Sequence, residues 1–136
     1  MEERRKQMMG VLEIGDIELI AEDMTDRSLS PGFKDRAPDV FQKYKEVKLR
    51  NSSRHYLEIM QAMMAAMANP PDLRQLKCPT LIIAGEYDSL SPVDAVFSMA
   101  KAIPDAAVRI LPTGHASAIE APEVFNRAVL EFINRL

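Results

Sequence analysis

The sequence predicts an α/β fold, in which a helical segment over residues 1–70 is followed by a strand-helix-strand-helix unit over residues 71–136. Three observations predict this class. Apolar residues recur at helical spacing before the proline pair Pro70-Pro71. Two short, β-branched apolar runs follow that pair, and an amphipathic helical stretch separates them. Because a helix connects the two strands, we expect them to be parallel neighbours with a right-handed crossover.

Turn and cap residues divide the first 70 residues into four expected helices. The helices are expected over residues 3–12, from Gly15 or Asp16, over residues 39–50, and after a cap at Ser52 or Ser53. Prolines and glycine between residues 28 and 38 predict a loop. The last helix carries four methionines at helical spacing, Met60, Met63, Met64 and Met67, and Asn69-Pro70-Pro71 ends it.

The second part contains the two predicted strands, residues 80–84 and 107–111. Ser91 is expected to cap the helix between them, with Pro92 in its first turn. Its buried stripe is predicted to consist of Val93, Val96, Phe97, Ala100 and Ile103. Pro122 starts the last helix, whose inward residues are predicted to be Phe125, Val129, Phe132, Ile133 and Leu136.

The bulk properties exclude several function classes. The net charge of −3 provides no basic field for nucleic acid. No apolar run approaches the roughly 18 residues that span a membrane, and the charged N-terminus does not predict a signal peptide. The one cysteine, Cys78, excludes an internal disulfide and a cysteine-based metal site, so we expect a cytoplasmic protein with Cys78 packed as a small apolar residue.

Ionisable residues follow both predicted strands. Asp88 comes shortly after the first strand, and His115 comes shortly after the second. Parallel strands end at the same edge of a sheet, so we expect the two side chains to lie within hydrogen-bond reach. An imidazole oriented by a carboxylate is the part of a Ser-His-Asp triad that activates a hydroxyl nucleophile. The pair therefore indicates nucleophilic hydrolysis without a metal or cofactor.

The chain from residue 73 onward resembles the C-terminal half of the α/β-hydrolase superfamily. The resemblance rests on residues 73–88, Ser91-Pro92, Ile103-Pro104-Asp105-Ala106, Gly114-His115, and Glu120-Ala121-Pro122-Glu123-Val124-Phe125. The helical residues 1–70 are similar, more loosely, to the cap of that family, and the whole is loosely similar to 3-oxoadipate enol-lactonases, esterases and cofactor-free haloperoxidases. The resemblance implies a partial α/β-hydrolase fold with Asp88 as the triad acid and His115 as the triad base. It also implies hydrolysis of an ester, lactone or similar acyl bond.

The motif that carries the nucleophile of that family is absent from this sequence. Its serine lies in Gly-x-Ser-x-Gly, and no two of the five glycines here are four residues apart with a serine between them. Ser117 lacks the strand-turn-helix setting, and Ser89 and Ser91 are interpreted as loop and cap residues. We interpret Glu86 and Glu120 as loop residues with local hydrogen bonds. The simplest account is a chain without the N-terminal half that carries the nucleophile and oxyanion hole, and this chain alone is then expected to be inactive.

Alternatives remain open for the function and for the methionines. The methionine stripe is more often core, but under the resemblance it could line the site of a small apolar acyl substrate. The protein could instead be a non-catalytic binding or assembly module, or a half-enzyme completed by a separate N-terminal chain. A parallel pair of apolar strands leaves faces and an edge to be covered, so we expect a homo-oligomer or a complex with such a complementary chain.

Overall fold

The computed structural model describes residues 6, 10, 11, 13 and 15–136. The chain divides into two compact units. The first unit consists of residues 1–25 and 39–71, and the second consists of residues 26–38 and 72–136. Of the predicted helix over residues 3–12, positions 6, 10 and 11 are helical, and the other positions lie outside the described residues. No described helix has both the length and the apolar composition needed to cross a membrane.

The helices of the first unit begin where the sequence predicts. They are α2 (Ile17–Arg27), α4 (Pro38–Leu49) and α5 (Ser53–Ala68); the last residues of α2 and the first of α4 belong to the second unit. The Asp16 carboxylate accepts a hydrogen bond from the Leu19 amide at 3.1 Å, and the Ser52 hydroxyl accepts one from the His55 amide at 3.3 Å. Both side chains satisfy amides that have no partner within their helix.

A buried lysine joins α2 to α4. The Lys48 ammonium donates to the Thr25 hydroxyl at 3.2 Å and lies 3.8 Å from the centre of the Tyr44 ring. The Thr25 hydroxyl donates in turn to the Ala21 carbonyl at 2.6 Å. Burial disfavours the charged form, and it lowers the pKa of Lys48 from 10.5 to about 8. Lys48 thus lies between Thr25 of α2 and Tyr44 of α4.

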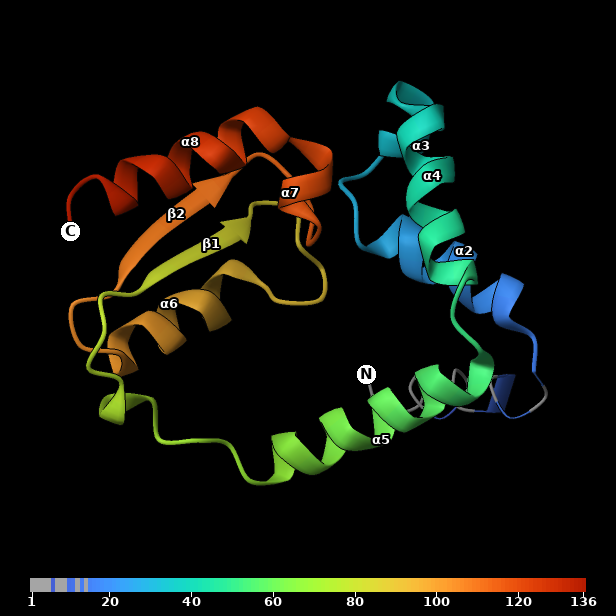
Figure 1. Ribbon diagram of the computed structural model, residues 1–136, viewed down its shortest axis with the longest axis horizontal. Helices are drawn as coiled ribbons and strands as arrows, with labels where there is room; N and C mark the ends of the chain where they lie inside the picture. Colours follow the sequence, from blue (N-terminus) through green and yellow to red (C-terminus); the bar gives the residue numbers. More distant parts are fainter. Residues whose placement is uncertain (1–5, 7–9, 12, 14) are drawn as a thin grey trace. The chain divides into compact units, whose positions relative to one another are not determined.

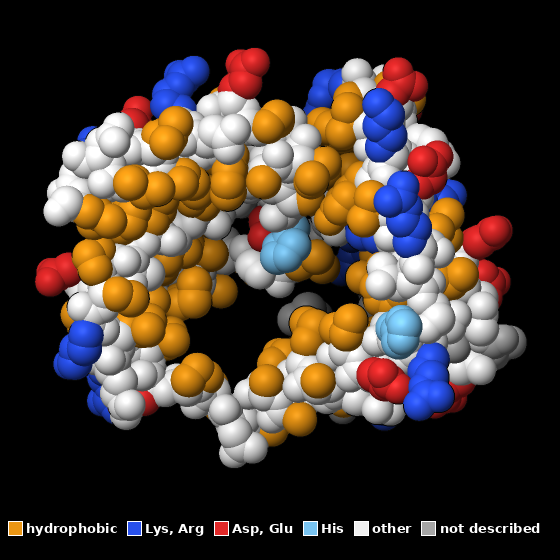
Figure 2. Space-filling view, in the orientation of Figure 1, with side chains coloured by type: hydrophobic (Ala, Val, Ile, Leu, Met, Phe, Trp, Pro, Cys, Tyr) orange, Lys and Arg blue, Asp and Glu red, His pale blue; other side chains and the backbone are white. Residues whose placement is uncertain are grey.

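The methionine helix α5 buries none of its residues. Met63, Met64 and Met67 are 59%, 40% and 61% exposed, and Figure 2 shows apolar side chains gathered along this helix. The interpretation of the stripe as core is therefore wrong for the described residues, because none of the side chains of α5 is buried. His55, on the same helix, is exposed.

The second unit is built on a two-stranded parallel sheet (Figure 1). Strand β1 (Leu81–Gly85) pairs with β2 (Ala107–Leu111) in a register that sets Leu81 beside Ala107 and Gly85 beside Leu111. Helix α6 (Val93–Ala102) connects the strands and packs on one face, and α8 (Pro122–Ile133) covers the other (Figure 1). The core consists of Ile82, Ala84, Val96 and Ile103, with partly buried Leu73, Ala100, Ala106 and Val108 against it. Three short elements complete the unit, namely α3 (Phe33–Arg36), η1 (Leu73–Gln75) and α7 (Ser117–Glu120).

The buried faces of α6 and α8 contain fewer residues than predicted. Phe97 is 46% exposed, because α6 turns Val96 and Ile103 toward the sheet. On α8 the buried residue is Ala128, whereas Ile133 is 53% exposed, and Leu136, which lies beyond the end of the helix, is 73% exposed. The sheet has two strands, which are too few to cover the full apolar stripe of either helix.

Three local predictions are also corrected. The expected loop over residues 28–38 contains the short helix α3, which Gly32 starts at φ 73°, a left-handed conformation that glycine adopts without strain. Pro92 rather than Ser91 precedes α6, and the Ser91 amide donates to Asp88 instead. Cys78 is exposed, because it lies in the extended segment before β1 and outside the packed core.

Candidate active site

The structure brings Asp88 and His115 together at the carboxyl end of the sheet. Asp88 follows β1 and His115 follows β2, so the pairing of the strands sets both residues at one edge. The Nδ1 atom of His115 lies 2.8 Å from Oδ2 of Asp88. Such a distance is typical of a charge-assisted hydrogen bond between an imidazole and a carboxylate. The predicted contact is confirmed, although the residues are 27 positions apart in the sequence.

Two backbone amides hold the Asp88 carboxylate in addition to the histidine. Its Oδ1 atom accepts hydrogen bonds from the amides of Leu90 at 2.8 Å and Ser91 at 2.9 Å, and its side chain is 4% exposed. The two amides and the imidazole fix both oxygens, so this buried carboxylate has little rotational freedom. The His115 side chain is 48% exposed, and in the described part of the chain its Nε2 atom has no hydrogen-bond partner.

The histidine loop, residues 112–116, lies in close contact with the backbone on two sides. The Tyr87 amide donates to the Thr113 carbonyl at 3.0 Å, and the Ala116 amide donates to the Ser28 carbonyl at 2.7 Å. A Cβ atom added to Gly85 would lie 2.2 Å from the Gly114 carbonyl oxygen, and one added to Gly114 would lie 2.5 Å from the carbonyl carbon of Leu29. Glycine is required at both positions because the opposing atoms are backbone.

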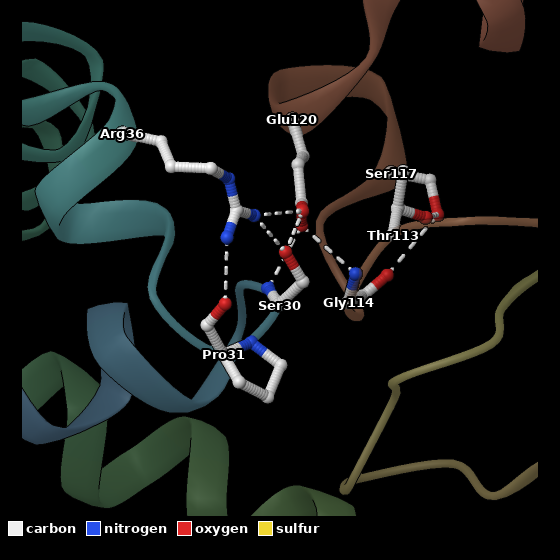
Figure 3. Close-up of polar contacts among 7 residues, drawn as sticks. All are labelled: Ser30, Pro31, Arg36, Thr113, Gly114, Ser117 and Glu120. Atoms are coloured by element: carbon white, nitrogen blue, oxygen red, sulfur yellow. Dashed lines mark hydrogen bonds and ion pairs between the residues drawn. The ribbon is translucent and has the colours of Figure 1, made fainter.

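A buried glutamate links this loop to a segment 90 positions earlier in the sequence (Figure 3). Oε2 of Glu120 accepts hydrogen bonds from the amides of Ser30 at 2.9 Å and Gly114 at 2.8 Å, and Oε1 accepts one from the Ser30 hydroxyl. The Arg36 guanidinium lies 3.8 Å from the same carboxylate and donates to the Ser30 hydroxyl at 2.7 Å. We call Glu120, Ser30, Arg36 and Gly114 the Glu120 cluster.

The interpretation of Glu120 as a loop residue with local hydrogen bonds is wrong. Glu120 belongs to α7, its side chain is 5% exposed, and two of its three hydrogen bonds come from Ser30. The sequence gives one signal for it, an acidic residue shortly before the Ala121-Pro122 start of α8. That position does not indicate a partner from residues 26–38. Glu86 is exposed and donates its amide to the Leu111 carbonyl at 2.8 Å.

Ser117 has a structural environment rather than that of a nucleophile. It is buried, its hydroxyl lies 2.8 Å from the Thr113 hydroxyl, and it donates to the Gly114 carbonyl at 3.2 Å (Figure 3). No hydrogen bond joins it to His115 in the described residues. Ser89 is exposed, and Ser91 contacts Asp88 through its backbone amide.

A cavity of about 330 Å³ lies beside the Glu120 cluster. Its lining consists of Ser30, Pro31, Arg36, Tyr87 and Pro112. The four methionines singled out in the sequence, Met60, Met63, Met64 and Met67, lie on α5 of the first unit. Among the described residues, no group of three His, Cys, Asp or Glu side chains has an arrangement that could hold a metal ion.

The chain is similar to hydrolases in sequence and in structure, although no family model matches it. It is 28% identical over 116 residues to 3-oxoadipate enol-lactonase 2 of Acinetobacter baylyi, which is 85% of this chain and 43% of the relative. The enol-lactonase of Burkholderia xenovorans superposes on 94% of this chain with a TM-score of 0.87 and 23% identity. A thermophilic esterase of Thermogutta terrifontis superposes on 98% with a TM-score of 0.78 and 28% identity.

These proteins are about twice as long as the matched region. The chain covers 49% of each of the two solved structures and less than half of the curated lactonase. The fold, the order of its elements and the sequence relatives agree with the family that the Asp88 and His115 motifs indicate. The chain is therefore similar to α/β-hydrolases in sequence and has part of the α/β-hydrolase fold.

Proposed function

We propose that this chain supplies the acid and the base of a Ser-His-Asp triad that hydrolyses an ester, lactone or similar acyl bond. One observation carries the proposal: the 2.8 Å contact between Nδ1 of His115 and Oδ2 of an Asp88 carboxylate whose other oxygen accepts two amides. The names of the relatives, lactonase and esterase, support the class of bond.

The geometry supports a separate role for each residue. With its Nδ1 proton donated to Asp88, the neutral imidazole has its lone pair on Nε2, and that atom is free to accept a proton from a hydroxyl. His115 then acts as general base during attack on the acyl carbon, and it returns the proton to the leaving group as general acid. Asp88 keeps the tautomer fixed and stabilises the imidazolium.

In this proposal the nucleophile comes from another segment. The hydroxyl of Ser117 is bonded to Thr113 and Gly114 on the buried side of the loop, so it does not suit attack on a substrate. A serine and its oxyanion hole would come from an extension of this polypeptide or from a complementary chain. The DNA upstream of Met1 discriminates these cases, because an in-frame Gly-x-Ser-x-Gly supports the extension.

We propose a small apolar acyl substrate. The methionines of α5, of which Met63, Met64 and Met67 are exposed and Met60 is partly buried, are flexible apolar side chains of the kind that line adaptable binding surfaces. The exposed apolar residues of α6 and α8, such as Phe97 and Ile133, support association with a second copy or a complementary chain. These same exposed faces favour the second candidate function, a non-catalytic assembly module.

The test is hydrolysis of a panel of esters and lactones by the protein translated from the full reading frame, alone or with its complementary chain. His115→Gln is expected to lower kcat by about 10²–10⁴-fold, the usual contribution of a general base. His55→Gln is the matched control, because the chain has two histidines and His55 is exposed on α5. Equal activity of the two variants would exclude His115 as the base. A product that is inactive on the whole panel would favour the assembly module.

A further inference from the structure

We propose that Glu120 is a positioning residue for His115, a role that builds on the proposed function. Its carboxylate stands between two backbone segments and fixes the loop that carries the imidazole. Glu120 is in direct contact with Gly114, the residue before His115, and it is not a member of the triad. Its proposed effect therefore passes through the backbone to the Asp88 contact.

The two segments run alongside each other without pairing directly at Gly114. The Ala116 amide donates to the Ser28 carbonyl, which ties the loop on the far side of His115. The amides of Gly114 and Ser30 share one acceptor. Oε2 of Glu120 accepts a hydrogen bond from each, at 2.8 and 2.9 Å. The carboxylate thus takes the place of a missing strand partner. His115 therefore lies between two residues whose backbone amides are hydrogen-bonded, Gly114 and Ala116, and the hydrogen bond of Gly114 depends on Glu120.

The acceptor atoms of the carboxylate are needed as well as its shape. The Glu120 side chain is 5% exposed, and hydrogen-bond donors and a cation surround it. The donors are the Ser30 amide, the Ser30 hydroxyl and the Gly114 amide, and the cation is Arg36. Glutamine has nearly the same shape, but its NH₂ group replaces one acceptor with a donor. In Glu120→Gln the NH₂ group, a donor, faces either the two backbone amides or the Arg36 guanidinium, which are donors as well.

The Asp88–His115 contact gives a direct readout of position, independent of turnover. An imidazole proton hydrogen-bonded to a carboxylate gives a proton NMR signal far downfield of the amides, and its exchange with water slows as the bond becomes better held. The experiment measures this Nδ1 proton in the 136-residue chain. Asp88→Asn identifies the signal, since it removes the charged acceptor. Glu123→Gln is the matched control, because Glu123 is an exposed glutamate three residues from Glu120.

We expect the proton of Glu120→Gln to exchange at least about tenfold faster than in the parent chain, or to disappear, while the amide signals of α6 keep their positions. Glu123→Gln is expected to match the parent. Arg36→Gln provides a second variant that should fold, because the Arg36 side chain is 58% exposed, and it is expected to exchange severalfold faster. Parent-like exchange in Arg36→Gln and in any folded Glu120→Gln would overturn the positioning role and leave the Asp88–His115 pair intact. Absence of the signal from the parent chain would overturn the pair and the positioning role together.

Discussion

Gly114→Ala tests whether the histidine loop is as tightly packed as its contacts indicate. The added methyl carbon would lie 2.5 Å from the carbonyl carbon of Leu29, 2.7 Å from the Ser30 nitrogen and 2.8 Å from the Leu29 Cα. All three are backbone atoms, so no side chain can rotate away to make room. The loop or residues 29–30 must move, and either movement strains the hydrogen bond from the Gly114 amide to Glu120.

Two effects determine the magnitude. Overpacking a tight site costs about 1–3 kcal/mol. Losing part of a hydrogen bond to a charged group adds to this, because an intact one contributes about 1.5–3 kcal/mol. We therefore expect Gly114→Ala to lower the free energy of unfolding of the second unit by about 3 kcal/mol. With a urea m-value of about 2 kcal/mol/M, the unfolding midpoint falls by about 1.5 M.

The measurement is urea unfolding followed by the amide NMR signals of β1 and β2, which report on the second unit alone. Gly10→Ala is the control, since a Cβ at Gly10 meets no atom within 4 Å and Gly10 lies in the first unit. It should leave the midpoint of the second unit unchanged. A Gly114→Ala midpoint within about 0.25 M of the parent, less than about 0.5 kcal/mol, would refute the close packing of the loop.

Three further predictions concern other parts of the chain. Because burial lowers the pKa of Lys48 to about 8, the unfolded chain binds more protons between that pH and 10.5, so the first unit should gain about 2–3 kcal/mol as pH rises through this window. Denaturation at pH 8 and at pH 10.5 measures the gain, and Lys48→Met should abolish it. The isolated chain should not react with a fluorophosphonate probe, and stoichiometric labelling that disappears in Ser117→Ala would instead make Ser117 the nucleophile. Light scattering over a dilution series should show a dimer or larger assembly, whereas a monomer that unfolds cooperatively would contradict association through the exposed faces.

The sequence predicts the strands and the Asp88–His115 contact because both depend on local signals. The run over residues 107–111 has the same bounds as β2, and the run over residues 80–84 differs by one residue from β1. Parallel pairing then follows from the helix between them, and it sets Asp88 and His115 at one edge. Two short strands, each followed by a residue of the right chemistry, are enough information for that inference.

The Glu120 cluster could not be predicted, because its information is not local. Ser30 and Glu120 are 90 residues apart, and neither lies in a periodic segment that fixes its direction. The exposure of Phe97 and Ile133 could not be predicted for a related reason. Helical spacing shows which residues share a face, but the width of the buried stripe depends on how many strands lie beneath it.

The Ser30–Glu120 and Asp88–His115 contacts join residues at different separations along the sequence, and this difference predicts the order in which the site assembles. Closing a loop of 90 residues costs about 1 kcal/mol more chain entropy than closing one of 27, so the contact of Ser30 with Glu120 is the more expensive one to form early. We expect β1, α6 and β2 to bring Asp88 and His115 together first, with residues 26–38 docking later. Mutations at Ser30 should then speed unfolding and leave the folding rate unchanged, whereas mutations in the β1–β2 core should slow folding.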